Sequence, residues 1–137
     1  MTNKKLTPEV EKTLWSAAEA AAELAYAPYS DCHVGAALLT NDGEVVTGCN
    51  VENASYGLCN CAERTALFRA IVEGKLSRGV GIDAIAVVHR DRHNCTPCGA
   101  CRQVLYEFGP AAIVLYEFEG GRRRTTVSAL LPESFQR

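Results

Sequence analysis

Three cysteines and one carboxylate lie in two short stretches of the sequence that could together hold a metal ion. Cys61 is followed two residues later by Glu63, and Cys98 is followed three residues later by Cys101. A separation of three residues lets one helical turn present both sulfurs to a single ion. Both stretches are typical of helix starts, and a helix N-terminus favours the thiolate form of cysteine that binds zinc. The sequence therefore predicts a zinc site built at two helix N-termini.

The number of ligands indicates which kind of zinc site to expect. Structural zinc is usually closed by four protein ligands, whereas catalytic zinc has three and keeps one position for water. Because three thiolates already exceed the charge of the ion, we expect Glu63 to handle protons rather than to bind the metal. Arg64 and Arg102 directly follow residues of the site. We expect them to hydrogen-bond the sulfurs and to offset their negative charge.

A purely structural site with four cysteines is the alternative interpretation. Cys59 could join the other three, and pairs of cysteines are more often structural than catalytic. The C-x-C spacing of Cys59 and Cys61 is, however, unfavourable for the usual zinc knuckle. In addition, Cys-Ala-Glu together with Pro-Cys-x-x-Cys matches the signature of zinc deaminases in its all-cysteine form. These two features favour the catalytic site.

Beyond these motifs, the sequence resembles the short-chain, homotetrameric cytidine deaminases over nearly its whole length. The matching segments are residues 26–30, 34–39, 48–57, 61–66, 97–103 and 130–132. The resemblance implies one zinc ion per chain and hydrolytic removal of the C4 amino group of cytidine and 2′-deoxycytidine, a reaction of pyrimidine salvage. Glu63 would then take a proton from the attacking water, pass it to ring N3 and protonate the departing amino group.

Two other functions remain open at the level of sequence. A zinc deaminase could act on another aminated, pyrimidine-like compound. A zinc-stabilised interaction domain would use Glu63 only as an acidic residue at a helix N-terminus.

The resemblance also assigns substrate contacts to positions spread along the chain: Asn50, Val51, Glu52, Tyr56, Ala62, Thr96 and Phe135. Asn50 and Glu52 would bind the ribose hydroxyls, because an amide and a carboxylate match their donors and acceptors. Taken alone, the same two residues are typical of a turn at the end of a strand. Backbone groups of Ala62 and Thr96 would contact the base.

Two aromatic residues are implied at subunit boundaries. Tyr56 would lie near a site between subunits, and Phe135 would reach a neighbouring subunit's site and stack on the pyrimidine. The alternative for Phe135 is packing on its own chain. Cys32 stands where the family usually has an aromatic residue, and it offers a substrate much less contact area.

Composition and charge limit the partners. The 137 residues are 47% hydrophobic, which suits one domain over residues 1–137, and a net charge of −2 argues against a nucleic-acid groove. No apolar run is long enough to span a bilayer, and the polar first residues do not resemble a signal peptide. The cysteine count, seven, suits metal binding in the reducing cytoplasm. We therefore expect a small nucleoside substrate, no nucleic acid and no membrane, and the resemblance implies a homotetramer with sites at subunit interfaces.

Periodicity and turn signals predict an α/β fold. The expected helices cover residues 8–26, 62–71, 99–108 and 128–131, and the expected strands cover residues 33–40, 44–49, 82–89, 112–116 and 122–127. Asn41-Asp42-Gly43 predicts a hairpin, whereas the strand, helix and strand of residues 82–116 predict a parallel pair. The sequence therefore predicts a three-layer α/β/α domain around a mixed sheet of about five strands, a cytidine-deaminase-like fold.

Overall fold

The chain folds around a mixed sheet of five strands in the order β2-β1-β3-β4-β5. The structure is a computed structural model that describes residues 6–137. The strands are β1 (Val34–Thr40), β2 (Val45–Cys49), β3 (Ile82–His89), β4 (Ile113–Phe118) and β5 (Gly121–Thr126). The expected architecture is confirmed. Residues 1–5, which were not expected to form a signal peptide, lie outside the described part of the chain.

Strand pairing follows the predicted connections. β1 is antiparallel to both β2 and β3, β3 is parallel to β4, and β4 is antiparallel to β5. The turn between β1 and β2 contains Gly43, whose φ of 87° is easily reached only by glycine. β3 is buried along its whole length because it is central and is covered on both faces.

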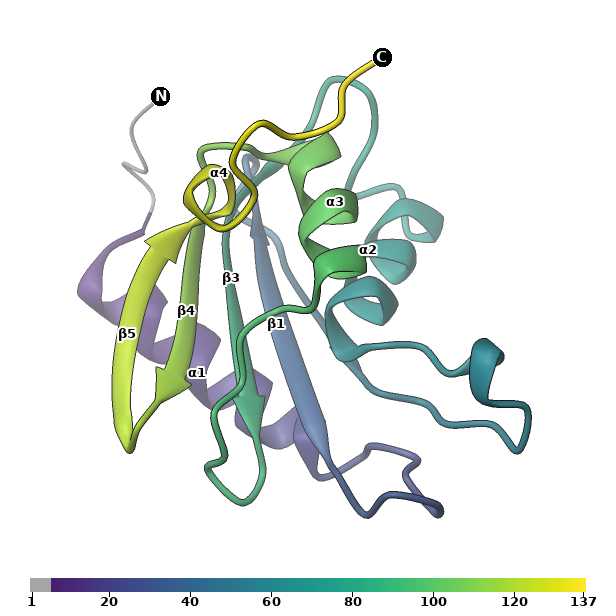
Figure 1. The fold of residues 1–137 in the computed structure, drawn as a ribbon. Helices are drawn as coiled ribbons and strands as arrows, with labels where there is room; N and C mark the ends of the chain where they lie inside the picture. The colour runs from purple at the N-terminus through teal and green to yellow at the C-terminus, as the bar shows by residue number, and fades with distance from the viewer. Residues whose placement is uncertain (1–5) are drawn as a thin grey trace.

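Helices cover both faces of the sheet, as Figure 1 shows. α1 (Pro8–Ala22) packs on one face through Leu14, Trp15 and Ala18, whereas α2 (Ala62–Val72) and α3 (Gly99–Phe108) cover the other. A short η1 (Tyr56–Leu58) precedes α2, and α4 (Val127–Leu130) follows β5. The three-layer prediction is therefore confirmed.

The first helix is shorter than its apolar stripe suggested. Thr7 caps the helix, because its Oγ1 accepts a hydrogen bond from the Val10 N–H at 3.2 Å. The helix ends at Ala22, and Tyr26 instead forms an isolated parallel bridge with Val51. The apolar residues that follow Ala22 are therefore not part of the helix. The bridge places Tyr26 beside Val51, in the segment that follows β2.

Two glycines allow helices to lie directly on the sheet. A Cβ atom on Gly35 of β1 would lie 2.0 Å from the Ala18 carbonyl oxygen of α1. A Cβ atom on Gly48 of β2 would lie 2.3 Å from the Ala66 nitrogen of α2. The position of α2, and with it the first candidate ligand, therefore depends on the absence of a side chain at Gly48.

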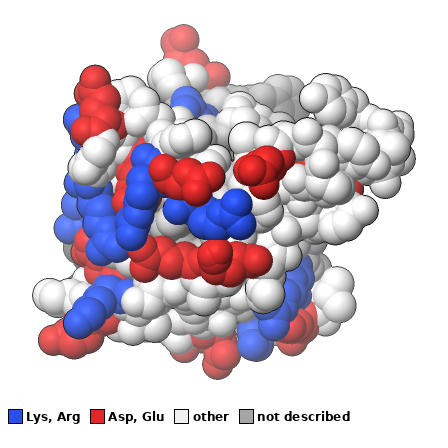
Figure 2. Space-filling model, turned by 90° about the horizontal axis from the view of Figure 1, so that it is seen from below, with Lys and Arg blue, Asp and Glu red and all other residues white. Residues whose placement is uncertain are grey.

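Residues 51–60 form an arm that projects from the body of the molecule, at lower right in Figure 1. An antiparallel bridge between Val51 and Asn60 closes the arm at its base. Apart from Glu52, the arm contains no charged residue. Figure 2 shows acidic and basic side chains interspersed over the left and centre of the molecule, whereas the part that projects at upper right is almost entirely uncharged. None of the helices in the described residues is long and apolar enough to cross a membrane.

Candidate active site

The three cysteines of the two motifs come together where α2 and α3 begin. Cys61 is the N-cap residue of α2, Cys98 is the N-cap residue of α3, and Cys101 lies in the first turn of α3. Their sulfur atoms all lie within 4.8 Å of one another, and those of Cys61 and Cys98 are 3.8 Å apart. Two helices that lie side by side on one face of the sheet, and that start at the same end, bring these sulfurs to one point.

The pKa values of Cys61 and Cys101 are shifted in opposite directions. The neighbouring thiol of Cys101, the Arg64 guanidinium and the thiol of Cys98 together lower the pKa of Cys61 to about 5. The Arg64 Nη2 atom lies 3.3 Å from the Cys61 sulfur. Hydrogen bonding to Cys61 and burial raise the pKa of Cys101. Since a cation among the three sulfurs would favour their thiolate forms, this donor set fits one zinc ion.

Glu63 lies in the first turn of α2, beside the cysteine cluster. Only 4% of the residue is exposed. Burial raises its pKa to about 7, and the negative charge of Cys61 acts in the same direction. A carboxyl group with this pKa can both accept and donate a proton near neutral pH.

Cys59 does not belong to the cluster. Its sulfur accepts a hydrogen bond from the Asn53 N–H at 3.3 Å and lies 3.7 Å from the Asn53 carbonyl oxygen, which it can bind as donor. The Cys59 thiol therefore links two parts of the arm and is not a candidate metal ligand. Among the described residues, the group that could hold an ion contains three cysteines, so the closed four-cysteine interpretation is not supported.

Asn50 and Glu52 follow β2 and bind the backbone of residues 29–34. Asn50 Oδ1 accepts from the Val34 N–H at 2.7 Å, and its Nδ2 donates to the Cys32 carbonyl oxygen at 2.8 Å. Glu52 Oε1 accepts from the N–H groups of Tyr29 and Ser30 at 2.9 and 3.1 Å. These two side chains therefore fix the conformation of the loop before β1 through hydrogen bonds to its backbone.

Sequence reasoning missed the contribution of Ser30. Its hydroxyl donates a hydrogen bond to Glu52 Oε2 and accepts one from the Cys32 N–H at 3.0 Å. The bond to Ser30 is the largest of the influences that lower the pKa of Glu52. A serine in a turn after proline is the signal present in the sequence, but it does not reveal a partner 22 residues away.

Comparison with known proteins agrees with this geometry. The family model described as "Cytidine and deoxycytidylate deaminase zinc-binding region" matches residues 8–117, which include the three cysteines and Glu63. The chain belongs to the cytidine and deoxycytidylate deaminase family.

Individual members of this deaminase family match closely. The chain is 53% identical over 117 residues to a cytidine deaminase of Halalkalibacterium halodurans, covering 84% of this chain and 86% of the relative. It is 45% identical over 131 residues to a cytidine deaminase of Sporosarcina psychrophila, covering 94% and 93%. The crystal structure of a cytidine deaminase from Burkholderia pseudomallei superposes with a TM-score of 0.82 at 55% identity, covering 90% and 98%.

The other residues expected to serve a deaminase lie in different surroundings. Ala62 is the first residue of α2 and is buried, and Thr96 is half-buried in the loop before Pro97. Tyr56 on the arm is 83% exposed and Phe135 near the C-terminus is 74% exposed. Within one chain, neither aromatic side chain is enclosed by the protein.

Arg102 differs from the expectation that it would hydrogen-bond a sulfur. Its Nε donates to the Pro97 carbonyl oxygen at 2.7 Å, and its Nη1 donates to the Leu130 carbonyl oxygen at 3.0 Å. The reason is its position, because α4 brings a carbonyl within reach of the first turn of α3. Of the two arginines, Arg64 takes the expected place at the sulfur.

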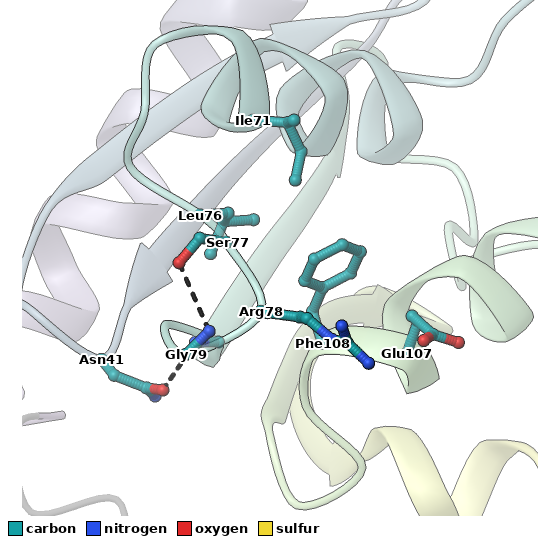
Figure 3. A pocket seen from close by; sticks show the side chains of 9 residues that line it. Asn41, Ile71, Leu76, Ser77, Arg78, Gly79, Glu107 and Phe108 are labelled. Carbon is teal, nitrogen blue, oxygen red and sulfur yellow. Dashed lines mark hydrogen bonds between the residues drawn. The ribbon is translucent and has the colours of Figure 1, made fainter.

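A pocket of about 640 Å³ lies at the other end of α2 and α3, away from the cysteines. Figure 3 shows Ile71 and Phe108 on its walls, with Arg78 and Glu107 as its charged side chains. It contains none of the residues that the deaminase family would use. Its size therefore does not make it the candidate active site.

Proposed function

We propose that this protein is a cytidine deaminase, which hydrolyses cytidine and 2′-deoxycytidine to uridine and 2′-deoxyuridine and releases ammonia. The observation that carries the proposal is a buried carboxyl group, Glu63, beside three cysteine sulfurs that converge on one point. The relatives from Halalkalibacterium halodurans and Sporosarcina psychrophila described above are cytidine deaminases. Pyrimidine salvage is the natural use of this reaction.

The metal ligands would be Cys61, Cys98 and Cys101. When bound there, zinc supplies a Lewis acid that makes a water molecule more acidic. Arg64 stabilises the thiolate of Cys61 and offsets part of the negative charge of the three sulfurs.

Glu63 would carry the protons of the reaction. It accepts a proton from the water whose oxygen adds to C4, and it delivers that proton to ring N3. It then moves the second proton of the same water to the amino group, so that the C4–N bond breaks and ammonia leaves. One carboxyl group suffices because its pKa of about 7 lets it hold and release a proton at neutral pH.

The nucleoside would lie between the loop before β1 and the N-terminus of α2. Asn50 and Glu52 keep bonding capacity for the ribose, because the Asn50 amide has a second N–H and Glu52 Oε2 has a second lone pair. Val51 lies between them in sequence, and the backbone of Ala62 and Thr96 would contact the base.

Assembly would complete the site. We propose a homotetramer in which Tyr56 and Phe135 lie against neighbouring subunits, and their exposure in the single chain supports this arrangement. Residues 1–137 would form one domain, since the described residues surround one sheet. A cytoplasmic location is proposed because the unpaired cysteines of this chain suit a reducing compartment.

The function is tested by following the loss of absorbance when the purified protein is mixed with cytidine or with free cytosine. We expect turnover of cytidine alone, with about one zinc per chain by metal analysis. Glu63→Gln should retain zinc and lose activity by about 10³-fold or more, because it cannot transfer protons.

Glu107→Gln on α3 is the matched control and should keep the wild-type rate, since Glu107 is exposed and lies far from the cysteines. Zinc without turnover of cytidine would contradict the proposal and would favour another aminated, pyrimidine-like substrate or a structural zinc site. A near-normal rate for Glu63→Gln would remove Glu63 from the mechanism.

A further inference from the structure

Arg102 joins two parts of the chain that are far apart in sequence. It lies in the first turn of α3, and its Nε donates to the carbonyl oxygen of Pro97, the residue before Cys98. Its Nη1 donates to the carbonyl oxygen of Leu130, the last residue of α4. A single guanidinium thus connects the loop that carries a candidate metal ligand with the residue directly before the C-terminal segment, defined here as residues 131–137.

The contact with Pro97 bears directly on Cys98. The Pro97 carbonyl group and the Cys98 nitrogen belong to the same peptide unit, which is planar. A hydrogen bond of 2.7 Å to this carbonyl therefore also orients the Cys98 backbone. Pro97 is buried and its ring restricts its φ, so the backbone of Pro97 has few other conformations. The hydrogen bond from Arg102 further restricts it.

The contact with Leu130 bears on the C-terminal segment. This segment lies on α3 through further hydrogen bonds, from Gln103 Nε2 to the Phe135 carbonyl oxygen and from Gln136 Nε2 to Tyr106 Oη, both at 3.3 Å. Most of the segment is exposed. Its position therefore depends on a small number of polar contacts, and the one from Arg102 lies where the segment begins.

We propose that Arg102 is a positioning residue that couples the orientation of Cys98 to the docking of the C-terminal segment on α3. The proposal rests on the proposed zinc site and on the proposed role of Phe135 in a neighbouring subunit. Binding of zinc at Cys98 strengthens the docking of the segment, and docking of the segment strengthens the binding of zinc, because such coupling is reciprocal. One subunit's metal site thereby influences the aromatic residue that it offers to its neighbour.

Arginine suits this task better than lysine. Its planar fork donates in two fixed directions at once, whereas an ammonium group is a single point at the end of a flexible chain. Arg102→Lys can therefore keep one of the two carbonyl contacts, and Arg102→Met can keep neither. These two variants separate partial from complete loss of the connection.

The test measures how fast a serine carboxypeptidase removes residues from the C-terminus of the full-length protein, with and without zinc. We expect zinc to slow the removal several-fold in the wild type, to have a smaller effect in Arg102→Lys and to have no effect in Arg102→Met. Release of zinc to a coloured chelator should also be about 10-fold faster in Arg102→Met, at the lower end of the effects that residues around a metal ligand have, because Arg102 acts on Cys98 only through the Pro97 peptide.

Two controls isolate the coupling. Gln103→Ala should speed the removal of residues equally with and without zinc, because it loosens the segment but does not contact Pro97. Arg124→Met on β5, whose guanidinium lies 3.8 Å from Glu11, should behave as the wild type in both assays.

Equal protection by zinc in Arg102→Met and in the wild type would overturn the proposal, and so would the absence of zinc-dependent protection in the wild type. If Arg102→Met does not fold, Arg102→Lys decides the question. Protection by zinc as strong in Arg102→Lys as in the wild type would then overturn the proposal. Neither assay requires turnover of cytidine, so a failure here is distinguishable from a failure of the proposed function.

Discussion

Two influences raise the pKa of the Glu63 carboxyl group, and both arise from its position on α2. Burial disfavours its charged form, and the neighbouring thiolate of Cys61 acts in the same direction, so that its pKa rises from 4.5 to about 7. Arg64 opposes this shift, but its guanidinium is directed at the Cys61 sulfur. A carboxyl group with this pKa is suited to the proton transfer that we propose for it.

This pKa predicts a dependence of stability on pH in the zinc-free protein. Folded Glu63 keeps its proton up to about pH 7, whereas an unfolded glutamate loses it near 4.5. Because the folded state binds more protons between these values, the free energy of unfolding falls as pH rises through this window. The loss is complete above about pH 7 and amounts to about 3 kcal/mol.

Urea unfolding of the zinc-free wild type and of Glu63→Gln at about pH 5 and about pH 8 checks this prediction. The variant lacks the titrating group, so its stability relative to the wild type should increase between the two pH values. A constant difference would show that the carboxyl group is better solvated than its burial indicates.

Cys95 shows that closeness to the site does not make a cysteine a ligand. It lies in the loop before Cys98, and burial together with the charges of Glu63, Glu117 and Cys61 raises its pKa to about 12. Among the described residues it does not belong to the group that could hold an ion.

At the scale of elements, the site depends on how closely α2 approaches the sheet. β2 meets α2 at Gly48, where an added Cβ would lie 2.3 Å from the Ala66 nitrogen and 2.7 Å from the Ala62 carbonyl oxygen. These are backbone atoms, which cannot move without moving the helix. Since Cys61 caps this helix and Glu63 lies in its first turn, a shift of α2 also displaces the site.

Two glycine substitutions distinguish a loss of folding stability from a loss of zinc affinity. Gly48→Ala should destabilise the protein by about 1–3 kcal/mol or more through overpacking. It should also weaken zinc binding, because α2 carries Cys61. Gly35→Ala causes a similar clash with Ala18 of α1, which carries no candidate ligand, and should destabilise the fold without a comparable effect on zinc.

Denaturant unfolding and zinc competition with a chelator measure the two effects. Equal zinc affinities for Gly48→Ala and Gly35→Ala would show that the position of α2 is not what holds the cysteines together.

At the scale of the whole molecule, the arm of residues 51–60 presents apolar side chains that a single chain leaves in water. Tyr56 is 83% exposed and Leu58 is 70% exposed. Groups of exposed apolar residues on a water-soluble surface mark interaction sites, and an arm with almost no charge is suited to pack against another subunit. This is the part of the molecule that we expect to be buried by assembly.

The prediction for assembly concerns Leu58→Glu. A charge at this position would be buried without a partner in the proposed interface, so the mass in solution should fall below that of the wild type. Activity should fall with it, because Tyr56 and Phe135 would no longer reach a neighbouring site. Light scattering measures the mass, and Ser16→Glu on the exposed side of α1 is the control. Unchanged mass in Leu58→Glu would exclude Leu58 from the interface.

Local sequence patterns predicted most of the elements and the candidate residues of the site. Thr7-Pro8 marks the start of α1, Asn41-Asp42-Gly43 marks the hairpin, and the apolar run of residues 82–89 marks the central strand. The spacing of the cysteines predicted the three candidate ligands whose sulfur atoms the fold brings within 4.8 Å of one another. These features are accessible because caps, turns and periodicity depend on neighbours within a few residues.

The hydrogen-bond partners of the polar side chains, in contrast, are known only from the folded chain. Arg64 and Arg102 occupy equivalent places after their motifs, yet one binds a sulfur and the other binds the carbonyls of Pro97 and Leu130. The partners of Glu52 lie more than 20 residues away, and the pKa of Glu63 depends on burial that α2 acquires on the sheet. Such contacts join distant segments, so they are set by how the helices pack on the sheet and not by local sequence.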